Sequence, residues 1–447
     1  MKSSTLQLKV RMAVLLFIEF AVWGSYLTSL GAYLSRVGLQ GQIGWFYAMQ
    51  GVVSIFMPAL VGIVADRWIQ AQRMLSLCHL LAGGFMLGAG VYGLSTAVPD
   101  FGILFLLYSL SVAFFMPTIG LSNSVCYTAL GKYNLDPVLH FPPVRVFGTI
   151  GFIVAMLFVN FTGYQNTAMQ LVTSGAMSIV MCLYALTMPK CPVSADKQKK
   201  SLVDALGLRA FVLFKDKQMA VFFIFSMLLG VSLQITNGFA NPFIQSFGSV
   251  AEYAGAWGVD NANALISLSQ MSETLCILLI PFFLRRFGIK VVMLMAMFAW
   301  VFRFGFFAVG NPGSGVAFFI LSMIVYGIAF DFFNVSGSLY VDKKTNTDIR
   351  SSAQGLFMVM TNGIGATVGT LAAQAVIDRY VYSQPAGVAQ VDGWHTAWYI
   401  FAGYALVVAV LFFLIFHDKD KQAPSGNEVK KAEAATAAAP DGMADTI

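Results

Sequence analysis

Residues Val10–Leu34 read VRMAVLLFIEFAVWGSYLTSLGAYL and contain two charged side chains, Arg11 and Glu19. The run is longer than the roughly 20 residues that a helix needs to cross a hydrocarbon core about 30 Å thick. A cleavable signal peptide has a shorter apolar region and ends at a small-residue cleavage site, which this run lacks. We therefore predict that it remains in the chain as a first membrane-spanning helix.

Similar apolar runs recur along nearly the whole chain of 447 residues, of which 58% are hydrophobic and 11% charged. A soluble domain usually has about a quarter of its residues charged. The sequence therefore predicts an all-α membrane protein with twelve transmembrane helices. We expect the spans near residues 10–34, 43–65, 72–95, 101–128, 141–161, 166–188, 219–247, 258–284, 291–309, 314–340, 352–377 and 395–416.

Basic residues gather in alternate loops between these spans. One set of loops holds nearly all of the lysines and arginines, whereas the opposite loops hold Arg36 and Arg379. Loops rich in Lys and Arg stay in the cytoplasm. We therefore expect a multi-pass protein with both termini in the cytoplasm. The distribution of the basic residues orients the chain in the lipid bilayer, so the net charge of +6 does not indicate nucleic-acid binding.

A polar stretch after the sixth span divides the chain in two. The predicted organisation is a six-helix bundle over 1–188, a central cytoplasmic loop over 189–218, a second six-helix bundle over 219–417 and a disordered cytoplasmic tail over 418–447. The segments Gly62–Arg67 and Pro281–Lys290 place small or helix-breaking residues and charges at equivalent turns of the two halves. This repeat resembles the loop signature of the major facilitator superfamily, whose halves are parallel repeats.

The five cysteines are scattered and form no CxxC pair, so they indicate neither a metal site nor a disulfide framework. The sequence also has no His/Cys/Asp metal cluster and no nucleophile–base arrangement. We expect a protein that is not an enzyme, that uses no cofactor and that functions as a monomer.

Polar side chains at membrane depth mark function because they are costly there. Spans seven and eight combine paired amides with a carboxylate, and spans five and ten present an arginine, a threonine and aromatic rings. Amides with a carboxylate suit a neutral polyhydroxylated solute, and aromatic faces suit a planar ring. Together they indicate a ligand with a sugar part and a flat part. The residues are Arg145, Thr149, Phe152, Gln234, Asn237, Gln270, Glu273, Tyr326 and Phe330.

Other polar residues of the spans leave alternatives open. Asp331 and Arg303 could form a buried ion pair instead of a site. Glu19 is either a proton carrier or a group solvated in the cavity. His79 is better explained by helix packing than by proton relay, and Asn362 by hydrogen bonding between helices. The Gly-x-x-x-Gly spacing of span eleven favours close helix packing.

Several longer strings resemble one family, the nucleoside:proton symporters of bacteria, over about residues 6–416. They are FPPVRVFGTIGF (Phe141–Phe152), FFIFSMLLG (Phe222–Gly230), LQITN (Leu233–Asn237), SQMSET (Ser269–Thr274), SMIVYGIAFDFFN (Ser322–Asn334) and SAQG (Ser352–Gly355). The resemblance implies the major facilitator fold and proton-driven nucleoside uptake through the inner membrane of a Gram-negative bacterium. It implies that the nine residues named above line the nucleoside site, with Asp331 beside it.

Within this resemblance, we assign the ribose to Gln234, Asn237, Gln270 and Glu273, and the base to Arg145, Thr149, Phe152, Tyr326 and Phe330. The proton-coupling candidates are Asp331, Glu273 and Glu19. Glu19 departs from the uncharged amide expected at its position in the family. Two rival functions are a sugar:proton symporter of the same superfamily and a passive facilitator.

Overall fold

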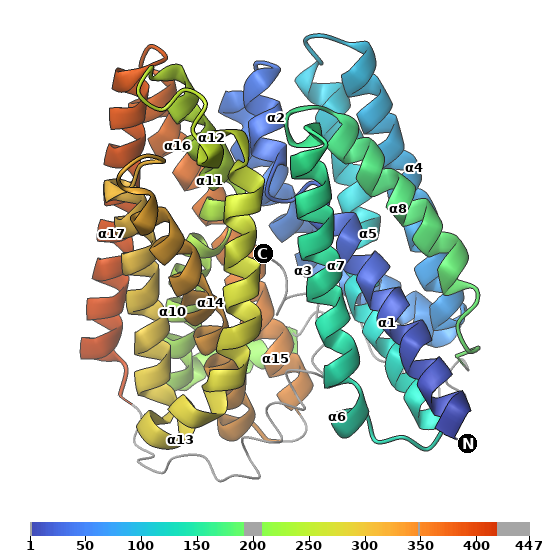
Figure 1. Cartoon of the computed structure of the whole chain (residues 1–447). Helices are drawn as coiled ribbons and strands as arrows, with labels where there is room; N and C mark the ends of the chain where they lie inside the picture. The colour runs from blue at the N-terminus through green and yellow to red at the C-terminus, as the bar shows by residue number, and fades with distance from the viewer. Residues whose placement is uncertain (1, 192–207, 347–348, 418–447) are drawn as a thin grey trace.

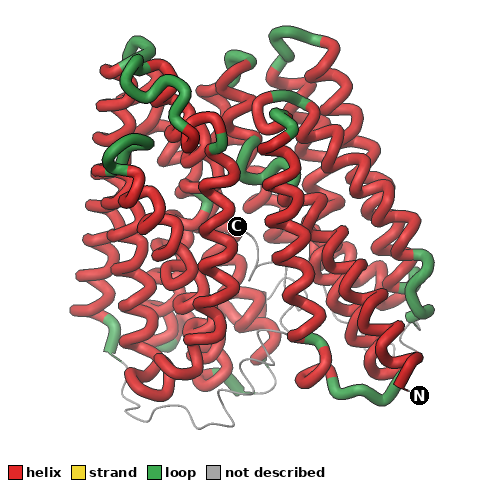
Figure 2. Tube along the Cα trace, viewed as in Figure 1, coloured by secondary structure: helices red, strands yellow, loops and turns green. Residues whose placement is uncertain are grey.

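A computed structural model of the chain describes residues 2–191, 208–346 and 349–417, and these form helices joined by turns and short loops. The helices lie in two groups that stand side by side, blue to green and yellow to red in Figure 1 and all red in Figure 2. We call them the N-terminal bundle and the C-terminal bundle. The structure thus has the predicted all-α membrane architecture.

The N-terminal bundle packs its helices mainly against one another, with α4 against α5 and α8, and α1 against α7 and α8. Its elements are α1 (Lys2–Gly24), α2 (Leu30–Arg36), η1 (Gln40–Gln42), α3 (Ile43–Arg67), α4 (Ala71–Ser95), α5 (Phe101–Lys132), α6 (Pro137–His140), α7 (Pro142–Phe161), η2 (Tyr164–Asn166) and α8 (Met169–Ala185).

The C-terminal bundle is centred on α13, which packs against α14 and α17, while α10 packs against α16. Its elements are η3 (Leu208–Lys215), α10 (Lys217–Leu233), α11 (Ile235–Ser246), η4 (Phe247–Ser249), α12 (Trp257–Asp260), α13 (Ala262–Val309), α14 (Val316–Lys344), α15 (Arg350–Met358), η5 (Val359–Gly365), α16 (Ala366–Ile377), η6 (Asp378–Tyr382) and α17 (Val388–Ile415).

Twelve spans can be counted among these helices. By length and composition, nine helices in the described part of the chain could cross a membrane. One of them, α13, is two spans, because Gly288 interrupts it with φ +77°, a left-handed conformation that glycine adopts readily. The shorter α8 and the N-terminal α1 complete the set.

The first span differs in its limits from the prediction. Its helix begins at Lys2 and ends at Gly24, and turns lead to the separate helix α2, so residues 10–34 are not one helix. A Cβ at Gly24 would lie 2.4 Å from the carbonyl oxygen of Phe152. The missing side chain therefore lets α1 and α7 meet backbone to backbone.

The glycines of span eleven confirm the predicted close packing. A Cβ at Gly369 would lie 2.2 Å from the carbonyl oxygen of Val231, and one at Gly365 would lie 2.4 Å from that of Met227. Both contacts join this span to α10. Gly365 is the last residue of a π-helix, η5, which follows α15 and holds Asn362.

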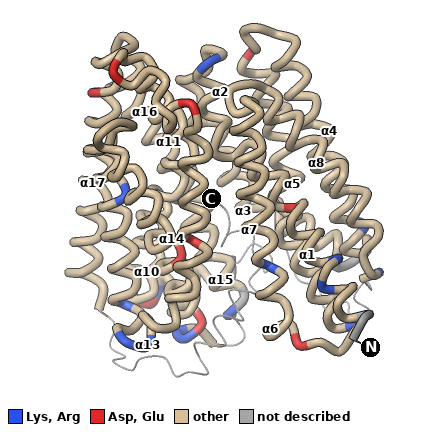
Figure 3. Tube along the Cα trace, in the orientation of Figure 1, with Lys and Arg blue, Asp and Glu red and all other residues tan. Residues whose placement is uncertain are grey.

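Hydrogen bonds between the bundles lie at the end of the molecule away from the N-terminus. Asn160 Nδ2 donates to Asn261 Oδ1 at 2.7 Å, and the backbone N–H of Gly44 donates to Gln374 at 2.7 Å. Thr28 donates to Asn263 in the same region. Figure 3 shows most of the Lys and Arg at the opposite end, in both bundles, whereas α2 at the joined end has one basic segment. The bundles are thus joined at the end that has few basic residues.

Two predicted segments fall wholly or partly outside the residues that the structure describes. Of the predicted central loop 189–218, the part from 192 to 207 is outside the described residues, and so is the whole predicted tail from 418. The bounds assigned to both segments remain predictions.

Candidate substrate site

Three of the predicted site residues lie along α7, whose first turn contains Pro142 and Pro143, where proline needs no hydrogen-bond partner. The guanidinium of Arg145 lies 4.0 Å from the centroid of the Phe20 ring of α1, a cation–π distance. A Cβ at Gly148 would meet both of these side chains. Phe152 is buried and meets Trp23 edge-on, with ring centroids 6.1 Å apart. Arg145 and Thr149 are half-buried.

Span seven passes from α10 to α11 at Gln234, whose backbone stays in the right-handed helical region (φ −88°, ψ −8°). Asn237 Nδ2 donates to Gln234 Oε1 at 2.9 Å, and both side chains are buried. The junction of the two helices thus holds a pair of buried amides, which have further donors and acceptors for a polar ligand.

Spans eight and ten bring the remaining candidates together. Tyr326 and Phe330 of α14 stack with their ring centroids 5.9 Å apart and their planes at 3°. Gln270 and Glu273 of α13 are buried one helical turn apart. Glu273 interacts electrostatically with Tyr326, so the carboxylate and the aromatic stack belong to one cluster.

Charges of both bundles meet at this cluster. Glu273 interacts electrostatically with Asp331 of α14 and, across the bundle interface, with Arg145 of α7. Through Arg145, a cation of the N-terminal bundle, the cluster connects span five with spans eight and ten of the C-terminal bundle.

Arg303 has other partners than the Asp331 considered from the sequence. Its guanidinium donates to Ser269 Oγ at 3.3 Å, to the carbonyl oxygen of Ser322 at 3.0 Å and to Thr236 Oγ1 at 3.1 Å. It also lies 4.2 Å from the centroid of the Tyr326 ring. These hydrogen bonds tie spans seven to ten together, so the alternative of an Arg303–Asp331 ion pair is wrong for this structure.

Comparison with known proteins identifies the family of this chain. A model described as "Nucleoside H+ symporter" matches residues 6–421. The xanthosine permease of Escherichia coli K12 is 46% identical over 93% of this chain and 98% of its own length. The nucleoside permease NupG of the same strain is 43% identical over 95% and 99%. The chain belongs to the nucleoside:proton symporter family. It is a transporter and not an enzyme.

A solved structure agrees with the family assignment. The crystal structure of nucleoside transporter NupG has a TM-score of 0.83 and 44% identity, and covers 92% of this chain and 100% of its own. The major facilitator fold predicted for this symporter is thus confirmed over nearly its whole length.

Glu19 of this symporter does not lie in a water-filled cavity, which corrects one of the two predicted alternatives. Its carboxylate is fully buried in the N-terminal bundle, where it bonds Nε2 of His79 and the Thr118 hydroxyl. Sequence reasoning did not find these partners, because they lie 60 and 99 residues away along the chain. Only the pairing of a buried acid with a buried histidine could have suggested them.

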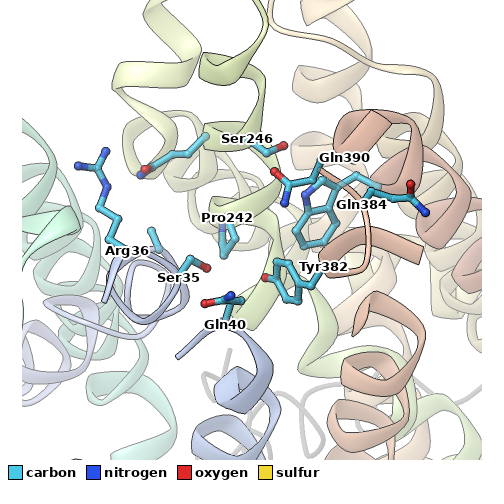
Figure 4. Close-up of a pocket in the computed structure, with 11 residues that line it drawn as sticks. Ser35, Arg36, Gln40, Pro242, Ser246, Tyr382, Gln384 and Gln390 are labelled. Atoms are coloured by element: carbon cyan, nitrogen blue, oxygen red, sulfur yellow. The ribbon is translucent and has the colours of Figure 1, made fainter. Parts of the chain in front are cut away.

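A separate cavity of about 430 Å³ lies between the two bundles (Figure 4). Side chains of α2 and η1 face those of α11, η6 and α17 across it. It contains none of the predicted nucleoside residues. We regard it as the part of the space between the bundles that remains open when they close at the end away from the N-terminus.

Proposed function

We propose that this symporter binds a nucleoside between its bundles, with the ribose held by Gln234, Asn237, Gln270 and Glu273, and the base held by Arg145, Thr149, Phe152, Tyr326 and Phe330. The observation that carries this proposal is the buried amide pair of Gln234 and Asn237 in span seven. A nucleoside presents hydroxyls that both donate and accept, and the amides and carboxylate supply both kinds of partner. The parallel rings of Tyr326 and Phe330 offer a flat face for a base.

The closed end supports alternating access as the mechanism. With both termini in the cytoplasm, the hydrogen-bonded end around Asn160 and Asn263 faces outward. The cluster of basic residues at the N-terminal end supports this orientation. We further propose that the protein lies in the bacterial inner membrane and functions as a monomer.

Proton coupling in the C-terminal bundle is proposed for Asp331. Two neighbouring carboxylates resist being ionised together. Glu273 interacts electrostatically with Arg145 of the other bundle and is assigned to the ribose, so we assign the coupling proton to Asp331. Asp331 lies beside the aromatic stack, so that it can respond to substrate without holding it.

An uptake competition panel in reconstituted vesicles tests the whole proposal. Unlabelled nucleosides should compete with labelled nucleoside, whereas free ribose should not. Accumulation should require an inward proton gradient. Competition by sugars alone would favour the sugar symporter, and uptake that is indifferent to the gradient would favour the passive facilitator.

A further inference from the structure

A closed network of side chains fills the middle of the N-terminal bundle, away from the nucleoside residues. Nε2 of His79 (α4) lies 2.8 Å from Oε2 of Glu19 (α1), and its Nδ1 lies 2.9 Å from Oγ of Ser178 (α8). The other carboxylate oxygen of Glu19 lies 2.6 Å from Oγ1 of Thr118 (α5). Glu19 and His79 are 0% exposed. Four helices thus contribute one polar group each.

Each hydroxyl of this network has a second acceptor. Thr118 Oγ1 lies 2.6 Å from the carbonyl oxygen of Phe115, and Ser178 Oγ lies 3.0 Å from that of His79. A hydroxyl has one proton to donate and can also accept. It can therefore donate to Glu19 or His79, or turn to the carbonyl and accept from a protonated Glu19 or His79.

This choice lets the network take up a proton without losing hydrogen bonds. With Glu19 ionised and His79 neutral, both hydroxyls donate inward and His79 donates its Nε2 proton to Glu19. When a proton is added at Nδ1 of His79, the Ser178 hydroxyl turns to donate to the backbone carbonyl. Its oxygen then accepts a hydrogen bond from the new Nδ1–H. The net charge of the Glu19–His79 pair then changes from −1 to 0, with no heavy atom displaced.

From this geometry we propose that Glu19 and His79 form a second proton-binding site of the symporter, in the N-terminal bundle and separate from the nucleoside residues. The proposal rests on proton-coupled transport as the function. Because neither side chain is exposed, the proton can exchange with water only after the surrounding helices move. Exchange that depends on conformation is what coupling requires.

The pair is also connected to the substrate site. Glu19 precedes Phe20, whose ring packs under Arg145, and Arg145 interacts with Glu273. A change of charge at Glu19 therefore occurs next to Phe20, the residue whose ring packs against Arg145, and Arg145 is one of the residues proposed to hold the base.

Other titratable groups close to Glu19 are few. Cys78 of α4 and Cys126 of α5 interact with it electrostatically, and Cys126 also interacts with Arg145 of α7. From α8 the network receives the uncharged hydroxyl of Ser178. His79 is thus the one basic partner that the structure places in contact with the Glu19 carboxylate.

A merely structural role, in which the pair braces α1 against α4, is the competing explanation. It predicts that Glu19→Gln and His79→Gln lower stability but leave the pH profile of uptake unchanged. Our proposal predicts that each variant still binds nucleoside and catalyses counterflow, but loses part of the pH dependence of uptake that the wild type shows. His395→Gln is the matched control, since His395 bonds a backbone carbonyl in the C-terminal bundle.

A second measurement uses the wild-type protein and does not depend on whether a variant folds. The chain has four histidines, so ¹⁵N-histidine spectra of the purified protein can be assigned with single His→Gln variants. We expect the His79 nitrogens to change protonation within the pH range of transport, and this change to move in Glu19→Gln. A His79 ring that keeps one state across that range, or an unchanged pH profile in both variants, would overturn the proposal. Wild-type uptake without any pH dependence would instead remove the proton-coupled function itself.

Discussion

Asn237 donates a hydrogen bond of 2.9 Å to Gln234, the residue that joins α10 and α11 in span seven. The bond orients both amides, so that each keeps a donor or acceptor for a ligand. We expect Gln234→Ala or Asn237→Ala to weaken nucleoside binding by a factor of about five to 150, because a lost hydrogen bond to a buried polar group costs roughly 1–3 kcal/mol.

Calorimetry on the purified variants measures this loss directly. Asn241→Ala is the matched control, because Asn241 is a buried amide of the same helix α11 whose oxygen bonds Gln245 instead. Wild-type affinity in Gln234→Ala would remove the ribose assignment.

The stacked rings of Tyr326 and Phe330 predict a graded response to substitution. Tyr326→Phe keeps the flat face, whereas Tyr326→Leu removes it and should weaken binding about two- to tenfold, since an aromatic pair contributes roughly 0.5–1.5 kcal/mol. Binding assays with Phe332→Leu give the control, because Phe332 packs on Phe283. Equal affinities in the two Tyr326 variants would exclude stacking.

The position of Arg145 predicts which reagents reach it. Arg145→Cys should react with a charged thiol reagent and be protected by nucleoside, because Arg145 is half-buried and close to Glu273. The five native cysteines are buried, so the background should be low. Phe147→Cys is the control on the exposed face of α7, which lipid covers. An Arg145→Cys site that nucleoside never protects contradicts the binding role.

The contact of Gly31 with Gly238 predicts how closure at the outer end can be blocked. A Cβ at Gly31 would lie 2.2 Å from the carbonyl oxygen of Gly238, so Gly31→Ala should disfavour closure by about 1–3 kcal/mol. Spin labels at Arg36 and Gln384, which face the cavity of Figure 4, should then move apart. Gly84→Ala, where a Cβ meets nothing within 4 Å, should leave their distance unchanged.

The sequence predicted the number of spans, the turn between spans eight and nine and the close packing of span eleven, because length, charge and glycine spacing are local signals. It misplaced the end of the first helix at Leu34, since apolar character continues past Gly24 although the helix does not. Hydropathy reports burial and not helix continuity.

Polar contacts between distant segments could not be predicted in the same way. Arg303 bonds three residues of three other spans, and Glu19 bonds His79 and Thr118. Each of these side chains is costly alone in a membrane, so its presence predicts that a partner exists. Which residue is the partner depends on the rotation and depth of the helices, which only the assembled bundle determines.

Asp331 gives the last prediction, which separates substrate binding from proton coupling in the C-terminal bundle. Asp331 and Glu273 interact electrostatically with each other, and Glu273 also interacts with Arg145. Direct competition between proton and substrate at Glu273 would work against symport, so the coupling proton is better held at Asp331. We expect Asp331→Asn to bind nucleoside and to exchange it between equilibrated compartments, but not to accumulate it against a gradient. Glu273→Gln should lose binding instead. Proton-driven accumulation measured beside counterflow in the same vesicles distinguishes the two, and uphill uptake retained by Asp331→Asn would return the coupling role to Glu273 and Glu19.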